Sequence, residues 1–95
     1  MMNEFKIGGY AISTAGHDAD KCYVIFQKDS EYVYLVDGEN KTIDRPKKKK
    51  IIHVQMLDQL NQTLADKVVN KSVINEEIKR AIKLLQYGNS SKEVE

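Results

Sequence analysis

The 95-residue sequence has one cysteine, one proline and no long run of hydrophobic residues. A single cysteine, Cys22, excludes an intrachain disulfide, and a lone thiol fits a reducing compartment. No apolar stretch approaches the roughly 18–20 residues that a helix needs to span a bilayer. The opening residues 1–4 are not followed by an apolar segment, so we expect no signal peptide, no membrane partner and a cytoplasmic location.

Motifs that mark catalysis or cofactor binding are also missing. There is no Walker loop, no G-x-G-x-x-G turn and no framework of paired carboxylates. Histidine and aspartate occur without the dense spacing of metal ligands, which argues against a zinc site. Cys22 lies near His17 and Asp18, but it begins an apolar strand, where a buried and inert thiol is the ordinary finding. We therefore expect no metal, no cofactor, no small-molecule substrate and no enzymatic activity.

The formal net charge is only +1, but charge is distributed unevenly along the chain. Residues 1–40 carry three lysines against seven acidic residues, a net charge of −4. Residues 41–54 carry six basic residues against one acidic residue, a net charge of +5, and residues 55–95 are balanced. An anionic partner is therefore expected to meet one local face, whereas a non-specific polycation is basic throughout.

The positive charge is concentrated in residues 45–50, whose sequence is RPKKKK. Pro46 fixes its own φ near about −65° and pushes Arg45 towards extended backbone. An extended lysine run spaces cations at intervals comparable to those of phosphates along a nucleic-acid strand, which predicts a phosphate-contacting ribbon. Lysines on an edge strand also block unwanted strand pairing, so a solvated edge strand is the alternative interpretation.

Residues 1–54 have the pattern of about five short strands separated by turns, which is typical of a small antiparallel barrel. The expected strands are residues 10–15, 21–27, 31–36, 40–43 and 50–54. Gly8-Gly9 indicates a bend before the first strand, and Asp37-Gly38 indicates a hairpin turn into the fourth. If Ile52 and Val54 point inward, His53 points outward on the basic side, where it can stack on a base or pack on the surface.

After Val54 the hydrophobic spacing becomes helical. One short helix is predicted where four apolar residues recur at near-helical spacing: Met56, Leu57, Leu60 and Leu64. A second helix is predicted over residues 76–86 from one apolar stripe made of Ile78, Ala81, Ile82 and Leu85. Asn75 suits its N-cap and Gly88 suits the position after its end. We expect residues 1–54 to form the barrel and residues 55–95 to form a helical extension packed on it, with the last residues frayed.

Several sequence blocks occur in an order and spacing that resemble a known family. They are GYAISTAGHD at residues 9–18, YVI at residues 23–25, YVYLVDG at residues 32–38, RPKKKK at residues 45–50, and His53. Together they resemble the small KOW-domain RNA-binding proteins, which are similar to a family of archaeal and eukaryotic large-subunit ribosomal proteins. The resemblance covers roughly residues 8–54.

This resemblance implies a five-stranded SH3-like β-barrel whose loops and basic edge contact structured RNA, commonly ribosomal RNA, with ribosomal proteins as further partners in translation. The KOW motif would be the hairpin of residues 10–25, with Gly16 at its turn glycine. The family's hairpin loop is usually basic, whereas this loop contains Asp18 and Asp20, which repel phosphate. We therefore expect the basic segment to carry more of the binding. The candidate RNA-binding residues are Arg45, Lys47, Lys48, Lys49, Lys50, His53, Lys21, Gly16 and His17.

Other interpretations stay open. SH3-like barrels also dock on proteins of the transcription or translation machinery, and the net charge of −4 over residues 1–40 favours such a protein-interaction module. An enzyme acting through Cys22 would require a thiol of depressed pKa. Arg45 can pair with Asp44 or Glu39 instead of binding RNA. The strand tyrosines (Tyr10, Tyr23, Tyr32 and Tyr34) can stack on bases, although packing in or on the barrel is the commoner role.

Overall fold

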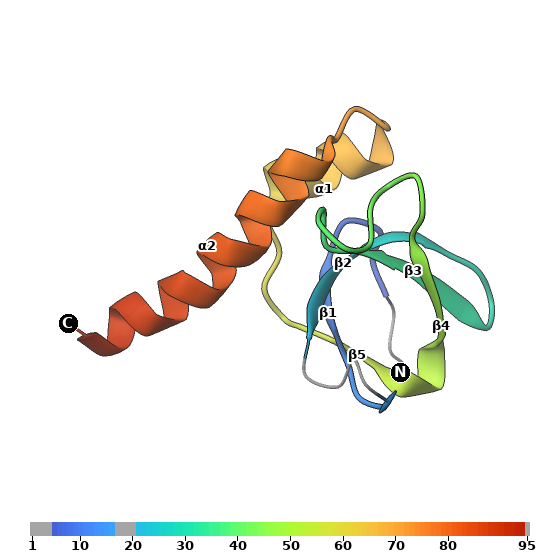
Figure 1. Cartoon of the computed structure of the whole chain (residues 1–95), viewed down its shortest axis with the longest axis horizontal. Helices are drawn as coiled ribbons and strands as arrows, with labels where there is room; N and C mark the ends of the chain where they lie inside the picture. The colour runs from blue at the N-terminus through green and yellow to red at the C-terminus, as the bar shows by residue number, and fades with distance from the viewer. Residues whose placement is uncertain (1–4, 17–20, 95) are drawn as a thin grey trace.

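The chain folds into a five-stranded antiparallel sheet followed by two helices (Figure 1). A computed structural model describes residues 5–16 and 21–94, with side chains as far as Gln86. The elements are β1 (Tyr10–Ser13), β2 (Cys22–Lys28), β3 (Tyr32–Val36), β4 (Lys47–Lys50), the 3-10 helix η2 (Ile51–His53), β5 (Val54–Met56), α1 (Gln62–Val69) and α2 (Asn75–Val94). The prediction of a mainly β fold with a helical C-terminal part is therefore confirmed.

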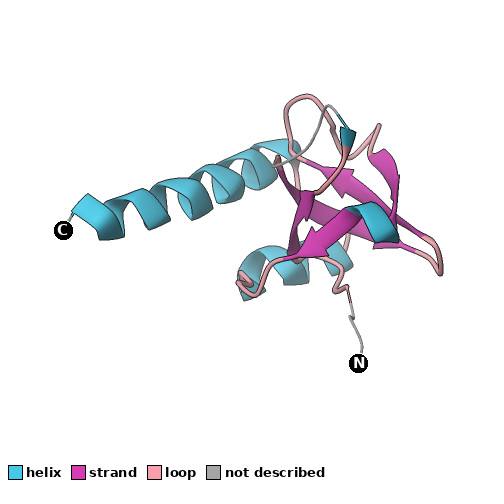
Figure 2. Ribbon diagram, turned by 90° about the horizontal axis from the view of Figure 1, so that it is seen from below, coloured by secondary structure: helices cyan, strands magenta, loops and turns pink. Residues whose placement is uncertain are grey.

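The five strands are arranged in the order β4-β3-β2-β1-β5, and every neighbouring pair is antiparallel. Figure 2 shows the strands gathered on one side of the molecule, with the long helix that runs to the C-terminus extending away from them. Tyr10 lies opposite Val24 in the β1–β2 pair, and a β-bulge follows Ile25 in the β2–β3 pair. The strands β4 and β5 occupy the two ends of this order and are joined by η2. The sheet is thus open, and a single turn of 3-10 helix links its two edge strands.

The two faces of the sheet bury different hydrophobic clusters. The inner cluster uses one alternating set of side chains: Phe5, Ala11, Tyr23, Ile25, Val33, Leu35 and Val54. The outer cluster joins the opposite face of β1–β3 to both helices: Tyr10, Val24, Val36, Leu64, Val68, Val73, Ile78, Ala81 and Ile82. The helices therefore cover only the part of the outer face around Tyr10, Val24 and Val36, and the outer face of β3 and β4 beyond them is not part of this cluster.

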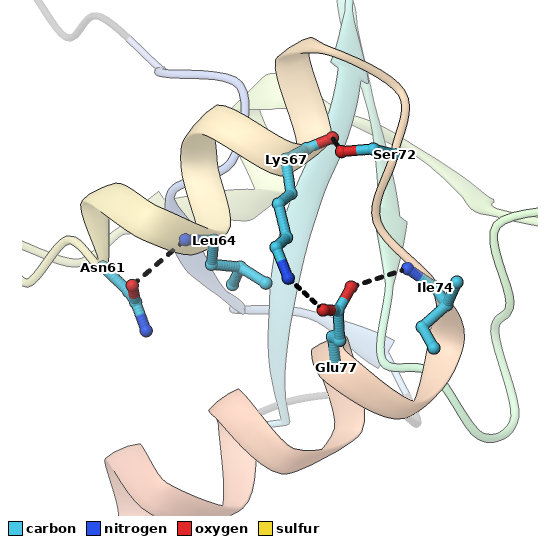
Figure 3. Close-up of polar contacts among 6 residues, drawn as sticks. All are labelled: Asn61, Leu64, Lys67, Ser72, Ile74 and Glu77. Carbon is cyan, nitrogen blue, oxygen red and sulfur yellow. Dashed lines mark hydrogen bonds and ion pairs between the residues drawn. The ribbon is translucent and has the colours of Figure 1, made fainter.

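Polar contacts fix the pair of helices (Figure 3). The side chain of Asn61 caps α1, because its Oδ1 accepts a hydrogen bond of 3.1 Å from the Leu64 N–H. Lys67 of α1 forms an ion pair with Glu77 of α2. The other carboxylate oxygen of Glu77 accepts a hydrogen bond of 3.1 Å from the Ile74 N–H, one residue before α2 begins. One carboxylate thus ties the two helices together and caps the second.

We expect Glu77→Gln to lower the thermal stability of the protein at pH 7. The Lys67 side chain, followed by the Ile74 N–H, holds the pKa of the Glu77 carboxyl below its usual range. A depressed folded-state pKa stabilises the protein above the unfolded pKa of about 4.3, and this contribution is lost as the pH falls through the folded value. Thermal melts of both proteins should therefore converge below about pH 4. Glu76→Gln, in the same helical turn, is the control; an equal effect there would rule out a specific role for Glu77.

The first turn of α2 also anchors the long connection between β3 and β4. The Oδ1 atom of Asn75 accepts a hydrogen bond of 2.9 Å from the Ile43 N–H. Gly38 adopts φ +83°, and a Cβ there would meet the backbone carbonyl oxygen of Asn75 and lie 2.8 Å from the Lys79 backbone nitrogen. The N-cap role predicted for Asn75 is therefore wrong. Its side chain instead holds the segment that leads into β4.

Several predicted boundaries are also wrong. Residues 40–43 form no strand, because the Asp37 carboxylate accepts the N–H groups of Glu39, Asn40 and Lys41, which are then not available to a strand partner. The fourth strand is the lysine run itself, and the expected strand at residues 50–54 is interrupted by η2. The helix expected around Met56–Leu64 begins only at Gln62, and α2 continues past Gly88 to Val94.

Candidate nucleic-acid interface

The four consecutive lysines form β4, which pairs with β3 and lies at one end of the strand order. Lysine has a low intrinsic preference for strands, so pairing with the apolar strand β3 imposes the extended conformation. A lysine-rich edge strand resists pairing with another chain. β4 therefore has the edge position that the alternative interpretation requires, and it carries four cations.

Alternation along β4 divides the lysines between the two faces of the sheet. Lys48 and Lys50 are exposed and lie opposite Tyr34 and Tyr32 of β3. Residues i and i+2 of a strand lie on the same face, with their Cα atoms roughly 7 Å apart. The ammonium group of Lys48 lies over the ring of Tyr32, 4.4 Å from the ring centroid. The outer face of the β3–β4 edge therefore combines two cations and two aromatic rings, and we call Tyr32, Tyr34, Lys48 and Lys50 the outer basic surface.

Lys47 and Lys49 lie on the opposite face of β4. They are half-buried and pair with Leu35 and Val33, which are fully buried in the inner cluster. The Lys49 ammonium donates a hydrogen bond of 3.1 Å to the Ala15 carbonyl. The four lysines of this strand are therefore not equivalent. Lys48 and Lys50 lie on the outer face, while Lys49 links β4 to the segment after β1 through its hydrogen bond to Ala15.

A second group of candidate residues meets near the end of β1. Gly16 has φ +79°, and a Cβ at this position would lie 3.8 Å from the Lys49 ammonium nitrogen. The N–H of Thr14 donates a hydrogen bond of 2.9 Å to the His53 carbonyl. Lys21 is exposed just before β2. Gly16, Lys49 and His53 are thus brought to the same end of β1, whereas His17 lies outside the described residues.

His53 is exposed, but its setting differs from the prediction. It ends η2 and does not lie on a strand. Val54 is buried as expected, whereas Ile52 is 78% exposed and does not point inward. The helical turn of η2 breaks the strand alternation, so the orientation expected from that alternation fails at Ile52. Ile52 is the most exposed of the large hydrophobic side chains that the structure describes.

Arg45 is exposed in the connection that leads into β4. Its backbone N–H donates a hydrogen bond of 2.9 Å to the Thr42 carbonyl, which makes a turn just before Pro46. Among the described residues, neither Asp44 nor Glu39 forms an ion pair with its guanidinium. Arg45 therefore adds a cation two residues before the first residue of β4.

One carboxylate lies beside the outer basic surface. The Asp29 side chain accepts hydrogen bonds from the N–H groups of Glu31, at 3.0 Å, and Tyr32, at 2.8 Å, in the turn between β2 and β3. It also accepts a hydrogen bond of 3.3 Å from the Tyr34 hydroxyl. The two backbone N–H groups, and more weakly Tyr34 and Lys48, lower the pKa of Asp29. The carboxylate is therefore ionised at neutral pH, and it orients the Tyr34 hydroxyl. Its negative charge also reduces the positive potential of the outer basic surface.

The four strand tyrosines separate into two roles. Tyr10 and Tyr23 are buried in the outer and inner clusters, as packing residues. Tyr32 and Tyr34 are half-buried on the outer face of β3, beside Lys48 and Lys50. Only the second pair lies where a ring can reach a ligand on the outer basic surface.

Burial raises the pKa of the half-buried Cys22 thiol to about 11. This shift is opposite in direction to the one that a nucleophilic thiolate requires. The rest of the Cys–His–Asp group considered from the sequence, His17 and Asp18, lies outside the described residues. The environment of Cys22 therefore gives no support to an enzyme that acts through this thiol.

We expect Cys22 to react with iodoacetamide at pH 8 on the order of 100-fold more slowly than the same residue in urea-unfolded protein, because a thiol of pKa about 11 is almost wholly protonated. The rate for the folded protein should still be rising at pH 10. Mass spectrometry of the alkylated protein measures both rates. Rapid alkylation that levels off near pH 7 would show an activated thiol instead.

No protein-family model and no curated protein matches this chain. Neither helix in the described ranges is both long and apolar enough to cross a membrane. Within the part of the chain that the structure describes, no three His, Cys, Asp or Glu side chains gather where they can hold a metal ion. The candidate interface therefore has to be interpreted from its own residues.

Proposed function

We propose that this protein binds structured RNA, with ribosomal RNA as the expected target, through the outer basic surface and Arg45. The observation that supports this most directly is the pairing of Lys48 and Lys50 with Tyr32 and Tyr34 on adjacent strands. Lysines contact phosphates without regard to sequence, and aromatic rings offer faces on which bases stack. A sheet holds both at fixed spacing, so little ordering is needed when the RNA binds.

We further propose that the sheet is a barrel of the SH3-like type. Several observations support a strongly curved, partly open barrel. The strands β4 and β5 lie at the two ends of the sheet order, and the short helix η2 joins them directly. The inner cluster contains both Val54 of β5 and Val33 of β3. Lys49 of β4 also reaches the segment after β1. A barrel of this type is what the resemblance to KOW-domain proteins implies, and we propose with it a place in the cytoplasmic translation machinery.

Binding in this proposal is driven mainly by counterion release. Each phosphate neutralised by lysine or arginine releases condensed cations, so the logarithm of the binding constant falls linearly with the logarithm of salt concentration. About four contacts, from Lys48, Lys50, Arg45 and one further cation, give a slope near −3 to −4. The half-buried Lys49 contributes less, because it already donates to the Ala15 carbonyl.

The proposal is tested by sedimenting purified protein with isolated ribosomal subunits over a series of salt concentrations. We expect binding to the large subunit that weakens with a slope of about −3 to −4. Naked ribosomal RNA should compete for the protein, because phosphates supply the contacts. Absence of binding to subunits and to RNA at about 50 mM salt would refute the proposed function.

A protein-interaction module is the second candidate, and one observation favours it. Three large apolar side chains of the helical part are more than half exposed: Val69, Ile74 and Leu84. Exposed apolar side chains that lie together in one patch mark contact surfaces for proteins. This alternative predicts binding to a protein that is insensitive to salt, together with little affinity for RNA.

A further inference from the structure

A hollow of about 350 Å³ lies next to the outer basic surface and shares Tyr32 and Lys50 with it. It is lined by Ser30, Glu31, Tyr32, Lys50, Ile51 and Ile52. These residues come from the turn between β2 and β3, from the end of β4 and from η2. The hollow therefore lies where the basic edge strand turns into the 3-10 helix.

The residues that line the hollow include one aromatic residue, Tyr32, and an exposed aliphatic residue, Ile52. Tyr32 is half-buried, and its opposite neighbour in the register is Lys50. Ile52 is 78% exposed, an unfavourable state for a large aliphatic side chain in water. Lys48, which lies over the Tyr32 ring, does not line the hollow. The backbone of this region is held in place, because the Ile51 N–H donates a hydrogen bond of 3.0 Å to the Glu31 carbonyl.

The charges around the hollow decide which part of a nucleotide suits it. Glu31 is one of the lining residues, and its negative charge repels a phosphate placed inside the hollow. Lys50 is another lining residue, and Lys48 lies two residues away on the same face of β4, so both ammonium groups can meet phosphates outside the hollow. An uncharged flat base is therefore favoured inside, with its flanking phosphates on the lysines.

We propose that this hollow receives a single unstacked nucleobase, between Tyr32 and Ile52, while Lys48 and Lys50 hold the adjoining phosphates. The inference rests on the proposed RNA binding and adds the substrate class: RNA with unpaired nucleotides, such as a loop or bulge, in preference to continuous duplex. Bases in loops can be splayed out and stacked on side chains at little cost, whereas bases in a duplex cannot. The exposed Ile52 then becomes covered when RNA binds.

The test compares two fluorescein-labelled RNAs of equal length, a hairpin with an unpaired loop and a blunt duplex. Affinities are measured for the wild type, Ile52→Ser, Tyr32→Leu and Tyr32→Phe. Stacking is worth enough per base that Ile52→Ser and Tyr32→Leu should weaken hairpin binding by about 5- to 100-fold. For Ile52→Ser, duplex affinity and the salt dependence should stay as in the wild type, and Tyr32→Phe, which keeps the ring, should retain hairpin binding.

The outcomes separate this inference from the proposed function. If the wild type binds both RNAs in a salt-dependent way and Ile52→Ser and Tyr32→Leu bind the hairpin equally well, the base site is refuted and RNA binding stands. If the wild type binds neither RNA at low salt, the proposed function fails and the base site fails with it. Ile52 is exposed, so its replacement is compatible with folding, and the result for Ile52→Ser decides the matter even if Tyr32→Leu is unstable.

Discussion

Replacing Lys48 and Lys50 together by glutamine is expected to weaken RNA binding by roughly 10- to 100-fold at low salt, on the order of 1.4 kcal/mol or less per lysine. The slope of log affinity against log salt should become shallower by about 1.4 to 1.8, because each lost phosphate contact removes roughly 0.7–0.9. Both side chains are exposed on the outer face of β4, so the fold should be unaffected. A fluorescence-anisotropy titration at several salt concentrations measures the affinity and the slope together.

The matched control removes the same charge from the helical part of the protein. Lys71 and Lys83 are exposed, and they lie after α1 and within α2. The variant Lys71→Gln/Lys83→Gln should keep affinity and slope close to the wild-type values. Equal losses in the two double variants would show that RNA responds only to net charge, and a specific role for β4 would then be untenable.

Gly38→Ala is expected to destabilise the protein by about 3 kcal/mol, from left-handed backbone strain and a steric clash. The residue has φ +83°, and a Cβ would collide with the carbonyl oxygen of Asn75 at the start of α2. For a domain of this size, the midpoint of thermal unfolding should fall by roughly 12–24 °C. Urea denaturation gives the free energy of unfolding directly.

Gly16→Ala is the matched control for this substitution. Gly16 has a similar φ of +79°, but the nearest atom to an added Cβ is the flexible end of Lys49, at 3.8 Å. Only the conformational strain of about 1 kcal/mol should remain. If both variants lost the same stability, the close contact between the β3–β4 connection and α2 would not contribute to the fold.

Hydrophobic pattern is sufficient to predict much of this fold. The first three strands and the apolar stripe of α2 lie close to where alternation and helical spacing place them, because Val24, Leu35 and Ile78 are each fully buried. The connection between β3 and β4 could not be predicted in this way. The Asp37 carboxylate and the Asn75 amide organise it through hydrogen bonds, and Asn75 is 32 residues from its partner Ile43 in the sequence.

The candidate interface was only partly predictable from the sequence. A run of four lysines marks the basic element, but strand alternation, fixed by pairing with β3, is what separates Lys48 and Lys50 from Lys47 and Lys49. The exposure of Ile52 carried no sequence signal, because the segment at residues 50–54 has the composition of a strand. This segment forms the 3-10 helix η2 because the chain passes there from edge strand β4 to edge strand β5, and that connection is specified only by the tertiary structure.

The most direct test of the proposed interface is an NMR titration of uniformly ¹⁵N-labelled protein with a structured RNA that contains an unpaired loop. We expect the largest amide shifts at Tyr32, Lys48, Lys50 and Ile52, with much smaller shifts along the described part of α2. Raising the salt concentration should reverse these shifts, because phosphate contacts weaken as counterions compete. Shifts concentrated on α1 and α2, or no shifts at low salt, would contradict RNA binding by the β3–β4 edge.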